Sequence, residues 1–374
     1  MQLALLRNQF AEGLLTRVGI LYGGCSTEHE VSLRSAATVA QHLDRSQFTV
    51  LPIFIDKQGR WLQDSRSLCA VEEAIPLATT GPTLQAVGFD RWPIALDCDV
   101  IFSLVHGRQG EDGTIQGLLE LCDIPYVGAG VLASAIGINK WMAKRLVADS
   151  QVAVVPFMVI KAVHWYQHIA HYAQQVQQTL SYPVFVKPVN TGSSIGISRV
   201  DDPAHLAKAV EDALQYDHQV LIEKALVARE IEVAVLENLN EADPPLVSIA
   251  GEILPNQAKH QFYSYAAKYL DEKGADFHIP ANLSPDQLKQ VQLLASKVFI
   301  DLGCAGMARV DFFLEKNTQQ FYFNEINTLP GFTAISMYPK LWEMSGMHLS
   351  TLLTQLIMLA MARHKKSKQL TVCF

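Results

Sequence analysis

The sequence lacks most of the features that mark secreted, membrane-bound or metal-cluster proteins. Its six cysteines are scattered and none belongs to a C-x-x-C pair, which indicates a reducing compartment and gives no zinc-site pattern. No apolar run reaches the roughly 20 residues that a membrane-spanning helix needs. The apolar run before Arg7 is too short for a signal peptide, so we expect a cytoplasmic protein without a membrane partner.

An excess of positive charge is also lacking. The 37 acidic residues outnumber the 30 basic ones, and the net charge of −7 argues against a nucleic-acid partner. The chain does have a hydrophobic content of 49% with 18% charged residues, as ordinary folded proteins do. Its 374 residues suffice for two or three domains.

Strands and helices alternate in the first third of the chain. This alternation predicts a parallel, doubly wound sheet, in which ligands bind beyond the carboxyl ends of the strands. The polar loops CSTEHE and HGRQGED fall at two such ends. The predicted strands are Val18–Tyr22, Phe48–Ile55, Asp99–Val105 and Ile124–Val127. One helix is predicted to begin near Glu30, and a second is predicted at Gly113–Cys122.

Two further units follow in the sequence. The second is predicted to contain a helix at Ile138–Ala148, strands at Val184–Pro188, Ile195–Val200 and Val220–Glu223, and a helix at Pro203–Tyr216 with Asp202 as N-cap. The third is predicted to contain strands at Ile231–Leu236 and Leu246–Leu254, followed by an irregular segment from Pro255 to Asn282. A helix at Pro285–Leu302, with a capping box of Ser284 and Gln287, is predicted next, and then a hairpin and a helix at His348–Ala362. A short helical extension is expected at Met1–Thr16, and Asp56–Pro93 contains no motif.

The predicted hairpin lies in the segment RVDFFLEKNTQQFYFNEINTLPGF. A central loop of about five residues places Asp311 opposite Glu325, and Arg309 opposite Asn327. Opposed carboxylates in an apolar hairpin repel each other, and a bound divalent cation removes that repulsion. Oxygen ligands favour Mg²⁺, whereas the alternative is an edge hairpin with solvated acids.

Other segments suggest a nucleotide site. The loop VKPVNTGSSIG, which contains Lys187, offers backbone N–H groups and a lysine to a phosphate, and a simple hairpin turn is the alternative. Lys140 begins a helix, where a lone lysine is usually solvated. The segment Pro255–Asn282 carries FYSYAAKYLD, which is typical either of an aromatic and cationic lid or of a packed Ω-loop. GAGVLA mimics a dinucleotide fingerprint but follows the fourth strand, which argues against a cofactor loop.

With these segments in order, the chain resembles the D-alanine–D-alanine ligases of the ATP-grasp superfamily. The resemblance rests on GGCSTEHEVSLRSA, HGRQGEDGTIQGLLELCDIPYVGAGVLASAIGINK, VKPVNTGSSIGIS, VLIEKAL, FYSYAAKYL, GMARVDFF and FNEINTLPGFTAISMYP. It implies an α/β ATP-grasp fold of three domains. These are an N-terminal substrate-binding domain with the doubly wound parallel sheet (1–128), a central ATP-grasp subdomain (129–227), and a C-terminal ATP-grasp subdomain with the metal site and lid (228–374).

The resemblance also implies a reaction. ATP would phosphorylate the carboxylate of one D-alanine, and the amine of a second would attack the acyl phosphate. The products would be D-Ala-D-Ala for peptidoglycan precursors, ADP and phosphate. Two Mg²⁺ ions, which Mn²⁺ can replace, would be held by Asp311, Glu325 and Asn327. A homodimer is expected.

The resemblance assigns roles to further residues. Those that match the family's ATP contacts are Lys140, Lys187 and Ser193 at the phosphates, Glu223, Lys224 and Leu226 at the adenine, and Glu230 at the ribose. Those that match its D-alanine contacts are Glu28 at the first ammonium, His106 beside it, and Lys268, Ser336 and Met337 at the second D-alanine. Arg309 and the backbone of Gly331 match the oxyanion stabilisers, and Ser193 and Tyr269 match residues that link the glycine-rich loop and the lid to Glu28.

Tyr269 bears on the second substrate. The resemblance implies that a tyrosine at this lid position favours an amine over a hydroxy acid. A ligase that makes D-Ala-D-Ser or D-Ala-D-Lac is the alternative. The lid sequence SYAA departs from relatives that have acidic residues there, which affects its detailed contacts.

Overall fold

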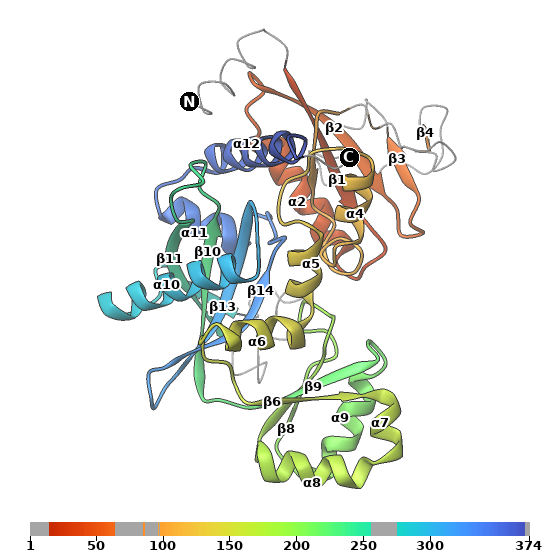
Figure 1. Ribbon diagram of the computed structural model, residues 1–374, viewed down its shortest axis with the longest axis vertical. Helices are drawn as coiled ribbons and strands as arrows, with labels where there is room; N and C mark the ends of the chain where they lie inside the picture. Colours follow the sequence, from red (N-terminus) through yellow and green to blue (C-terminus); the bar gives the residue numbers. More distant parts are fainter. Residues whose placement is uncertain (1–14, 64–84, 87–95, 97, 256–274, 371–374) are drawn as a thin grey trace.

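The computed structural model describes residues 15–63, 85–86, 96, 98–255 and 275–370, which form three sheets with their helices (Figure 1). The helical extension expected before residue 15, most of Asp56–Pro93, and the lid residues Lys268 and Tyr269 lie outside the described residues. Within the described ranges, no single helix is long and apolar enough to cross a membrane. The helices Met337–Met344 and Leu349–Ser367 reach that length only as a pair bent by 109°.

The first sheet combines three parallel strands with an antiparallel edge, in the order β4-β3-β2-β1-β5. The parallel strands are β1 (Thr16–Gly23), β2 (Phe48–Ile55) and β5 (Val100–Ser103), and the antiparallel ones are β3 (Trp61–Gln63) and β4 (Gln85–Ala86). The strand predicted at Ile124–Val127 shrinks to one bridge between Tyr126 and Ile101. Pro125 has no N–H to pair, and Gly128, with φ of +96°, turns the chain away.

Helices cover both faces of this sheet, as a doubly wound sheet requires. On one face, α2 (His29–His42) and the last helix, α12 (Leu349–Ser367), share a core with the sheet, in which Leu33 and Leu352 are buried. On the other face, α4 (Thr114–Leu121) buries Ile115 and Leu119. Figure 1 shows α12 lying across the N-terminal strands, so the end of the chain completes the first domain.

The central sheet is antiparallel, with the order β6-β9-β7-β8. Its strands are β6 (Phe157–Lys161), β7 (Val184–Pro188), β8 (Ser198–Val200) and β9 (Gln219–Lys224). The helices α7 (Ala162–Gln167), α8 (Ile169–Thr179) and α9 (Leu206–Ala213) share its core. The sequence did not predict β6, α7 or α8. The polar run AHYAQQVQQT in α8 buries Val176 but few other side chains, so its apolar period is weak. Asp202 caps the turn before α9 as predicted.

The C-terminal sheet is also antiparallel, with the order β12-β11-β10-β13-β14. Its strands are β10 (Ala228–Leu236), β11 (Leu246–Pro255), β12 (Ala275–His278), β13 (Met307–Glu315) and β14 (Phe321–Asn327). Strand β12 corrects the prediction that the chain is irregular throughout Pro255–Asn282. The helix α10 (Pro285–Asp301) has the predicted capping box, and α11 (Met337–Met344) was not predicted.

The hairpin of β13 and β14 has the predicted register. Asp311 lies opposite Glu325 and Arg309 lies opposite Asn327, with residues 316–320 as the loop. The register then shifts, so that Phe312 faces Phe323. This bulge follows the acidic pair and lets the rest of the hairpin continue as an apolar core strand.

The segment GAGVLA begins helix α5 (Val131–Ile138), which precedes α6 (Lys140–Asp149). The guanidinium of Arg363 donates to the carbonyl of Gly128, and a Cβ at Gly306 would lie 3.1 Å from the Gly128 backbone. Gly128 and Gly306 therefore allow the chain to pack closely at this point.

Candidate active site

A cavity of about 500 Å³ lies between the central and the C-terminal sheets. Strands β7 and β9 contribute to one side of it, and β10, β13 and β14 contribute to the other. Apolar side chains such as Phe185, Ile253 and Phe313 share its lining with charged groups, a combination that suits a planar base attached to phosphates. Residues predicted to bind ATP or metal that line it are Lys140, Lys187, Glu223, Lys224, Leu226, Glu230, Asp311 and Glu325.

Glu223 is held between two lysines at the floor of the cavity. Its carboxylate is buried, accepts a hydrogen bond from the Lys187 ammonium, and lies 3.2 Å from Nζ of the fully buried Lys144. Lys144 also donates to the carbonyl of Phe323 at 3.3 Å. Burial raises the pKa of Glu223, but the two lysines outweigh it and lower the pKa to about 2. Burial lowers the pKa of Lys144, although the Glu223 carboxylate opposes that shift. The two lysines and one carboxylate together therefore carry at most one net positive charge beside the cavity, which favours an anionic ligand.

Lys140 stands at the first position of α6, between the glycine-rich loop and the hairpin. The side chain of Asn139 caps the helix by accepting the N–H of Met142 at 2.9 Å. The Lys140 ammonium is buried, donates to the carbonyl of Thr191, and lies 3.6 Å from the carboxylate of Glu325. The start of the helix therefore directs this lysine toward the acidic pair of the hairpin.

Arg309 forms a two-pronged ion pair with Asp311. Its guanidinium donates to the two carboxylate oxygens at 2.8 and 2.7 Å, and its Nε lies 3.1 Å from Glu232. Burial lowers the pKa of Arg309, but the two carboxylates outweigh it and raise the pKa well above the ordinary value. Arg309 is therefore a fixed cation next to the acidic pair.

The hairpin offers oxygen donors to a cation without completing a site. In the part of the chain that the structure describes, no three or more His, Cys, Asp or Glu side chains are grouped to hold a metal ion. Asp311, Glu325 and the amide of Asn327 provide two carboxylates and one neutral oxygen, and the Asn327 oxygen also accepts the N–H of Leu329 at 2.9 Å. Such a set suits Mg²⁺ when ligand phosphates supply further oxygens.

Glu28 lies at the other end of the site, at the start of α2. Its carboxylate accepts a hydrogen bond from the hydroxyl of Ser193 in the glycine-rich loop. Ser193 and Ser194 both have positive φ, which exposes successive backbone N–H groups on one side of the loop. Gly107 has a φ of +75°, which favours glycine, and a Cβ there would lie 2.7 Å from the Glu28 carboxylate. The first and central domains therefore meet at a carboxylate.

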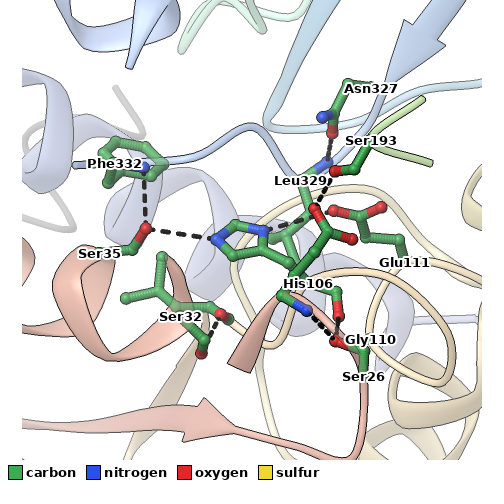
Figure 2. Close-up of polar contacts among 12 residues, drawn as sticks. Ser26, Ser32, Ser35, His106, Gly110, Glu111, Ser193, Asn327, Leu329 and Phe332 are labelled. Atoms are coloured by element: carbon green, nitrogen blue, oxygen red, sulfur yellow. Dashed lines mark hydrogen bonds and ion pairs between the residues drawn. The ribbon is translucent and has the colours of Figure 1, made fainter. Parts of the chain in front are cut away.

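His106 is buried behind Glu28. Its Nδ1 lies 3.3 Å from the carboxylate of Glu111, and its Nε2 lies 3.3 Å from the hydroxyl of Ser35 (Figure 2). Burial lowers the pKa of His106, but the hydrogen bond and charge of Glu111, together with the charge of Glu28, outweigh it and raise the pKa. His106 is therefore held in place beside Glu28 by Glu111 and Ser35.

The loop between β14 and α11 carries Gly331 and Ser336. A Cβ at Gly331 would lie 2.8 Å from the Ser336 hydroxyl, which also accepts the N–H of Thr333 at 3.0 Å. Met337 is buried in the core and its sulfur packs against Gly251, so a substrate contact would have to come from its backbone. Lys268 and Tyr269 belong to the segment outside the described residues.

Sequence reasoning missed several residues that shape this site. Lys144 follows Lys140 by four residues, a helical spacing that could have identified it. Glu111 stands in the same polar loop as His106. Nothing in the sequence singles out Ser35, because its importance depends on a contact with residue 332.

Comparison with known proteins identifies the family of the chain. The family model for the D-ala D-ala ligase N-terminus matches residues 17–129, and the model for the C-terminus matches residues 146–358. A D-alanine–D-alanine ligase A from Bradyrhizobium diazoefficiens is 48% identical over 369 residues, covering 95% of this chain and 97% of that protein. A D-alanine–D-alanine ligase from Legionella pneumophila is 44% identical over 349 residues, covering 92% of this chain and 95% of that protein.

Solved structures agree with this result. A D-alanine–D-alanine ligase from Coxiella burnetii superposes with a TM-score of 0.76 at 34% identity, covering 95% of this chain and 96% of that one. The VanG D-Ala:D-Ser ligase from Enterococcus faecalis superposes with a TM-score of 0.79 at 30% identity, covering 93% of this chain and all of that one. The predicted α/β ATP-grasp fold is confirmed. The chain belongs to the D-alanine–D-alanine ligase family, whose members are ATP-dependent ligases.

Proposed function

We propose that the protein joins two molecules of D-alanine at the expense of ATP. The γ-phosphoryl group passes to the carboxylate of the first D-alanine, and the amine of the second attacks the acyl phosphate. D-Ala-D-Ala, ADP and phosphate leave, and the dipeptide enters peptidoglycan precursors. The observation that carries this proposal is the cavity in which lysines and opposed carboxylates face one another, with Glu28 tied to the loop beside it.

The nucleotide occupies the cavity between the two ATP-grasp sheets. Lys140 and Lys187 neutralise its phosphates, with the backbone around Ser193 as a further donor. Glu223, although proposed for the adenine end, has its carboxylate engaged with Lys144 and Lys187 and thereby holds those cations in place. The remaining adenosine contacts are Lys224, Leu226 and Glu230, which line the same cavity.

Magnesium is the cation that the donor set fits. Asp311, Glu325 and Asn327 provide oxygen ligands only, and two Mg²⁺ ions, or Mn²⁺ in their place, would be shared with the phosphates. When bound, the cations neutralise the charge of the transferring phosphoryl group. The Asp311 carboxylate is already fixed in orientation, because Arg309 donates hydrogen bonds to both of its oxygens.

The D-alanine molecules bind between Glu28 and the loop after β14. Glu28 pairs with the ammonium of the first, beside the buried His106. Arg309 and the Gly331 N–H stabilise the oxyanion that develops at its carboxyl carbon. Ser336 and the start of α11 at Met337 receive the carboxylate of the second, together with Lys268. Tyr269 is the residue of the lid sequence that the family resemblance links to Ser193 and Glu28.

A D-Ala-D-Ser or D-Ala-D-Lac ligase is the second candidate, since a D-Ala:D-Ser ligase is among the similar structures. The test is identification of products when D-alanine, D-serine and D-lactate compete in the presence of ATP and Mg²⁺. We expect D-Ala-D-Ala to dominate, with little ester product because Tyr269 selects an amine. A majority of D-Ala-D-Ser would favour the second candidate, and the absence of phosphate release with any of the three would refute both.

We propose three further features that stay open to test. The domains divide at residues 128 and 227, although α5 and α6 pack against β14 of the C-terminal sheet. The protein acts as a homodimer, which sedimentation would reveal. It works in the cytoplasm, where its cysteines stay reduced.

A further inference from the structure

Two buried serines lie one turn apart on α2, and they connect different parts of the molecule. Ser32 accepts the N–H of Gly23 at 2.8 Å and donates to the carbonyl of Leu104 at 2.5 Å, both within the first domain. Ser35 instead accepts the N–H of Phe332 at 3.2 Å, from the loop of the C-terminal domain that carries Gly331. Both side chains are fully buried, and Figure 2 shows Ser35 between Phe332 and the His106 ring.

The far side of Ser35 is anchored by His106 and Glu111. Since a carboxylate accepts, Nδ1 of His106 carries a proton toward Glu111, and Nε2 faces the Ser35 hydroxyl. When the ring is neutral, Nε2 accepts the hydroxyl proton of Ser35. When the ring is protonated, Nε2 donates to Ser35 Oγ. In both states Ser35 Oγ can accept the Phe332 N–H.

Phe332 needs this acceptor. Its ring is buried in edge contacts with Phe102 and Tyr338, at centroid separations of 5.6 and 5.8 Å. Its N–H is therefore fixed deep in the interface between two domains, where an unpaired donor is costly. The loop is tied at one end by Asn327 and at the other by Ser336, and Ser35 ties its middle to the domain that contains Glu28.

We propose that Ser35 is a positioning residue for the ligase reaction. Through the Phe332 N–H it fixes the adjoining Gly331 backbone in space relative to Glu28, across the boundary between the first and the third domains. Glu28 and Gly331 are proposed to hold opposite ends of the same D-alanine, so their separation determines whether its carboxylate meets the oxyanion donors. This inference rests on the proposed function for its kinetic consequence, but the hydrogen bond itself can be tested without turnover.

The test compares Ser35→Ala with Ser32→Ala in the full-length protein. Both remove one buried hydroxyl from the same helix, but Ser32 lies outside the proposed contacts with substrate and joins parts of one domain. With D-alanine and ATP, we expect Ser35→Ala to lower kcat about tenfold, the equivalent of one hydrogen bond at the transition state, while KM for ATP changes less than about twofold. We expect kcat of Ser32→Ala to stay within about twofold of the wild type even if its Tm falls. Ser35→Cys, whose slightly larger side chain leaves no cavity but is a weak hydrogen-bonding group, should resemble Ser35→Ala.

Hydrogen exchange of the peptide that contains Phe332 provides the second measurement. Exchange should become faster in Ser35→Ala and stay unchanged in Ser32→Ala. Unchanged exchange in Ser35→Ala, or equal losses of kcat in the two alanine variants, would overturn the proposal. Activity near the wild-type level in Ser35→Cys, with the loss confined to Ser35→Ala, would also overturn it, because lost volume and not lost hydrogen bonding would then explain the effect. If the wild type made no D-Ala-D-Ala, the proposed function would fail while the exchange comparison still decided the role of Ser35.

Discussion

The two ends of the site, which we propose to bind the nucleotide and the D-alanine molecules, hold their geometry by different means. At the nucleotide end, buried charges hold one another, as in the arrangement of Glu223 between Lys144 and Lys187. At the D-alanine end, the contacts between domains are made by serine hydroxyls, Ser35 to the backbone of residue 332 and Ser193 to Glu28. The first end is held by ion pairs between full charges, and the second by serine hydroxyls that bond to a backbone N–H and to a carboxylate.

The difference follows from what each end has to do. A triphosphate brings several negative charges into a partly closed cavity, so the protein must supply buried cations and must stabilise those cations before the ligand arrives. A small amino acid brings one charge at each end, and the protein must mainly fix distances between groups from different domains. We therefore expect the loss of a charge at the nucleotide end to cost more activity than the loss of a hydroxyl at the other end.

The strongest test of this comparison is Glu325→Gln. The variant keeps the shape of the side chain but removes one of the two opposed carboxylates, and we expect kcat to fall by about a hundredfold or more. The fold should persist because Glu325 is partly exposed at the cavity. Phosphate release measures the activity, thermal unfolding checks the fold, and Glu211→Gln on the exposed face of α9 is the control. A near-normal kcat in Glu325→Gln would contradict the assignment of the metal site to this hairpin.

The next largest loss of activity is expected from the buried group of Lys144, Glu223 and Lys187. Lys144→Met leaves Glu223 with Lys187 alone, so Lys187 is drawn more firmly to Glu223 and is less available to a phosphate. We expect KM for ATP to rise about tenfold, with a smaller change in KM for D-alanine, and the midpoint of thermal unfolding to fall. The control is Lys208→Met, because the ion pair of Lys208 with Asp212 is exposed. Equal increases in the KM values for ATP and D-alanine would show that Lys144, Glu223 and Lys187 support the whole site and not the nucleotide end alone.

The same contrast explains how far sequence reasoning reached. Alternation along the strands and a short loop sufficed to predict that Asp311 faces Glu325, because hairpin pairing is a local property. Charged residues at strand ends and helix starts, such as Lys140 and Glu28, also stand out in the sequence. The pairing of the hairpin was therefore predictable from residue types and spacing, whereas the roles of Lys140 and Glu28 came from the family resemblance and stay predictions.

The D-alanine end was less predictable because it depends on contacts between distant segments. Ser35 reads as an ordinary small residue of an amphipathic helix, and only the packing of domains brings it to Phe332. Helix α8 and strand β6 were missed for a related reason: their stability comes from a core centred on Trp165 and not from a strong local period. Where tertiary packing supplies the energy, local pattern gives little signal.

The smallest effect that we predict is a pH dependence of stability that arises from His106. The raised pKa of His106 means that the folded state binds this proton more tightly than the unfolded chain does. Its contribution to stability is therefore fully present below the ordinary value of 6.5 and is lost as the pH rises through the raised pKa. Glu111→Gln removes the carboxylate that faces His106. We expect it to lower the free energy of unfolding by about 1 to 2 kcal/mol at pH 6, and by less at pH 9.

Urea unfolding of Glu111→Gln and the wild type at the two pH values measures this difference. Glu30→Gln is the matched control, since its ion pair with Lys57 is exposed and its loss should have little pH dependence over this range. The Glu223 carboxylate, whose pKa of about 2 lies below the ordinary value, contributes stability above pH 4.5 that is lost as the pH falls toward 2, so it adds no slope between pH 6 and 9. A difference between wild type and Glu111→Gln that stays constant from pH 6 to 9 would mean that Glu111 stabilises neutral and protonated His106 equally. The hydrogen bond between Glu111 and His106 would then stabilise this end of the site without a net contribution from the charge of His106, which would sharpen the contrast with the ion pairs of the nucleotide end.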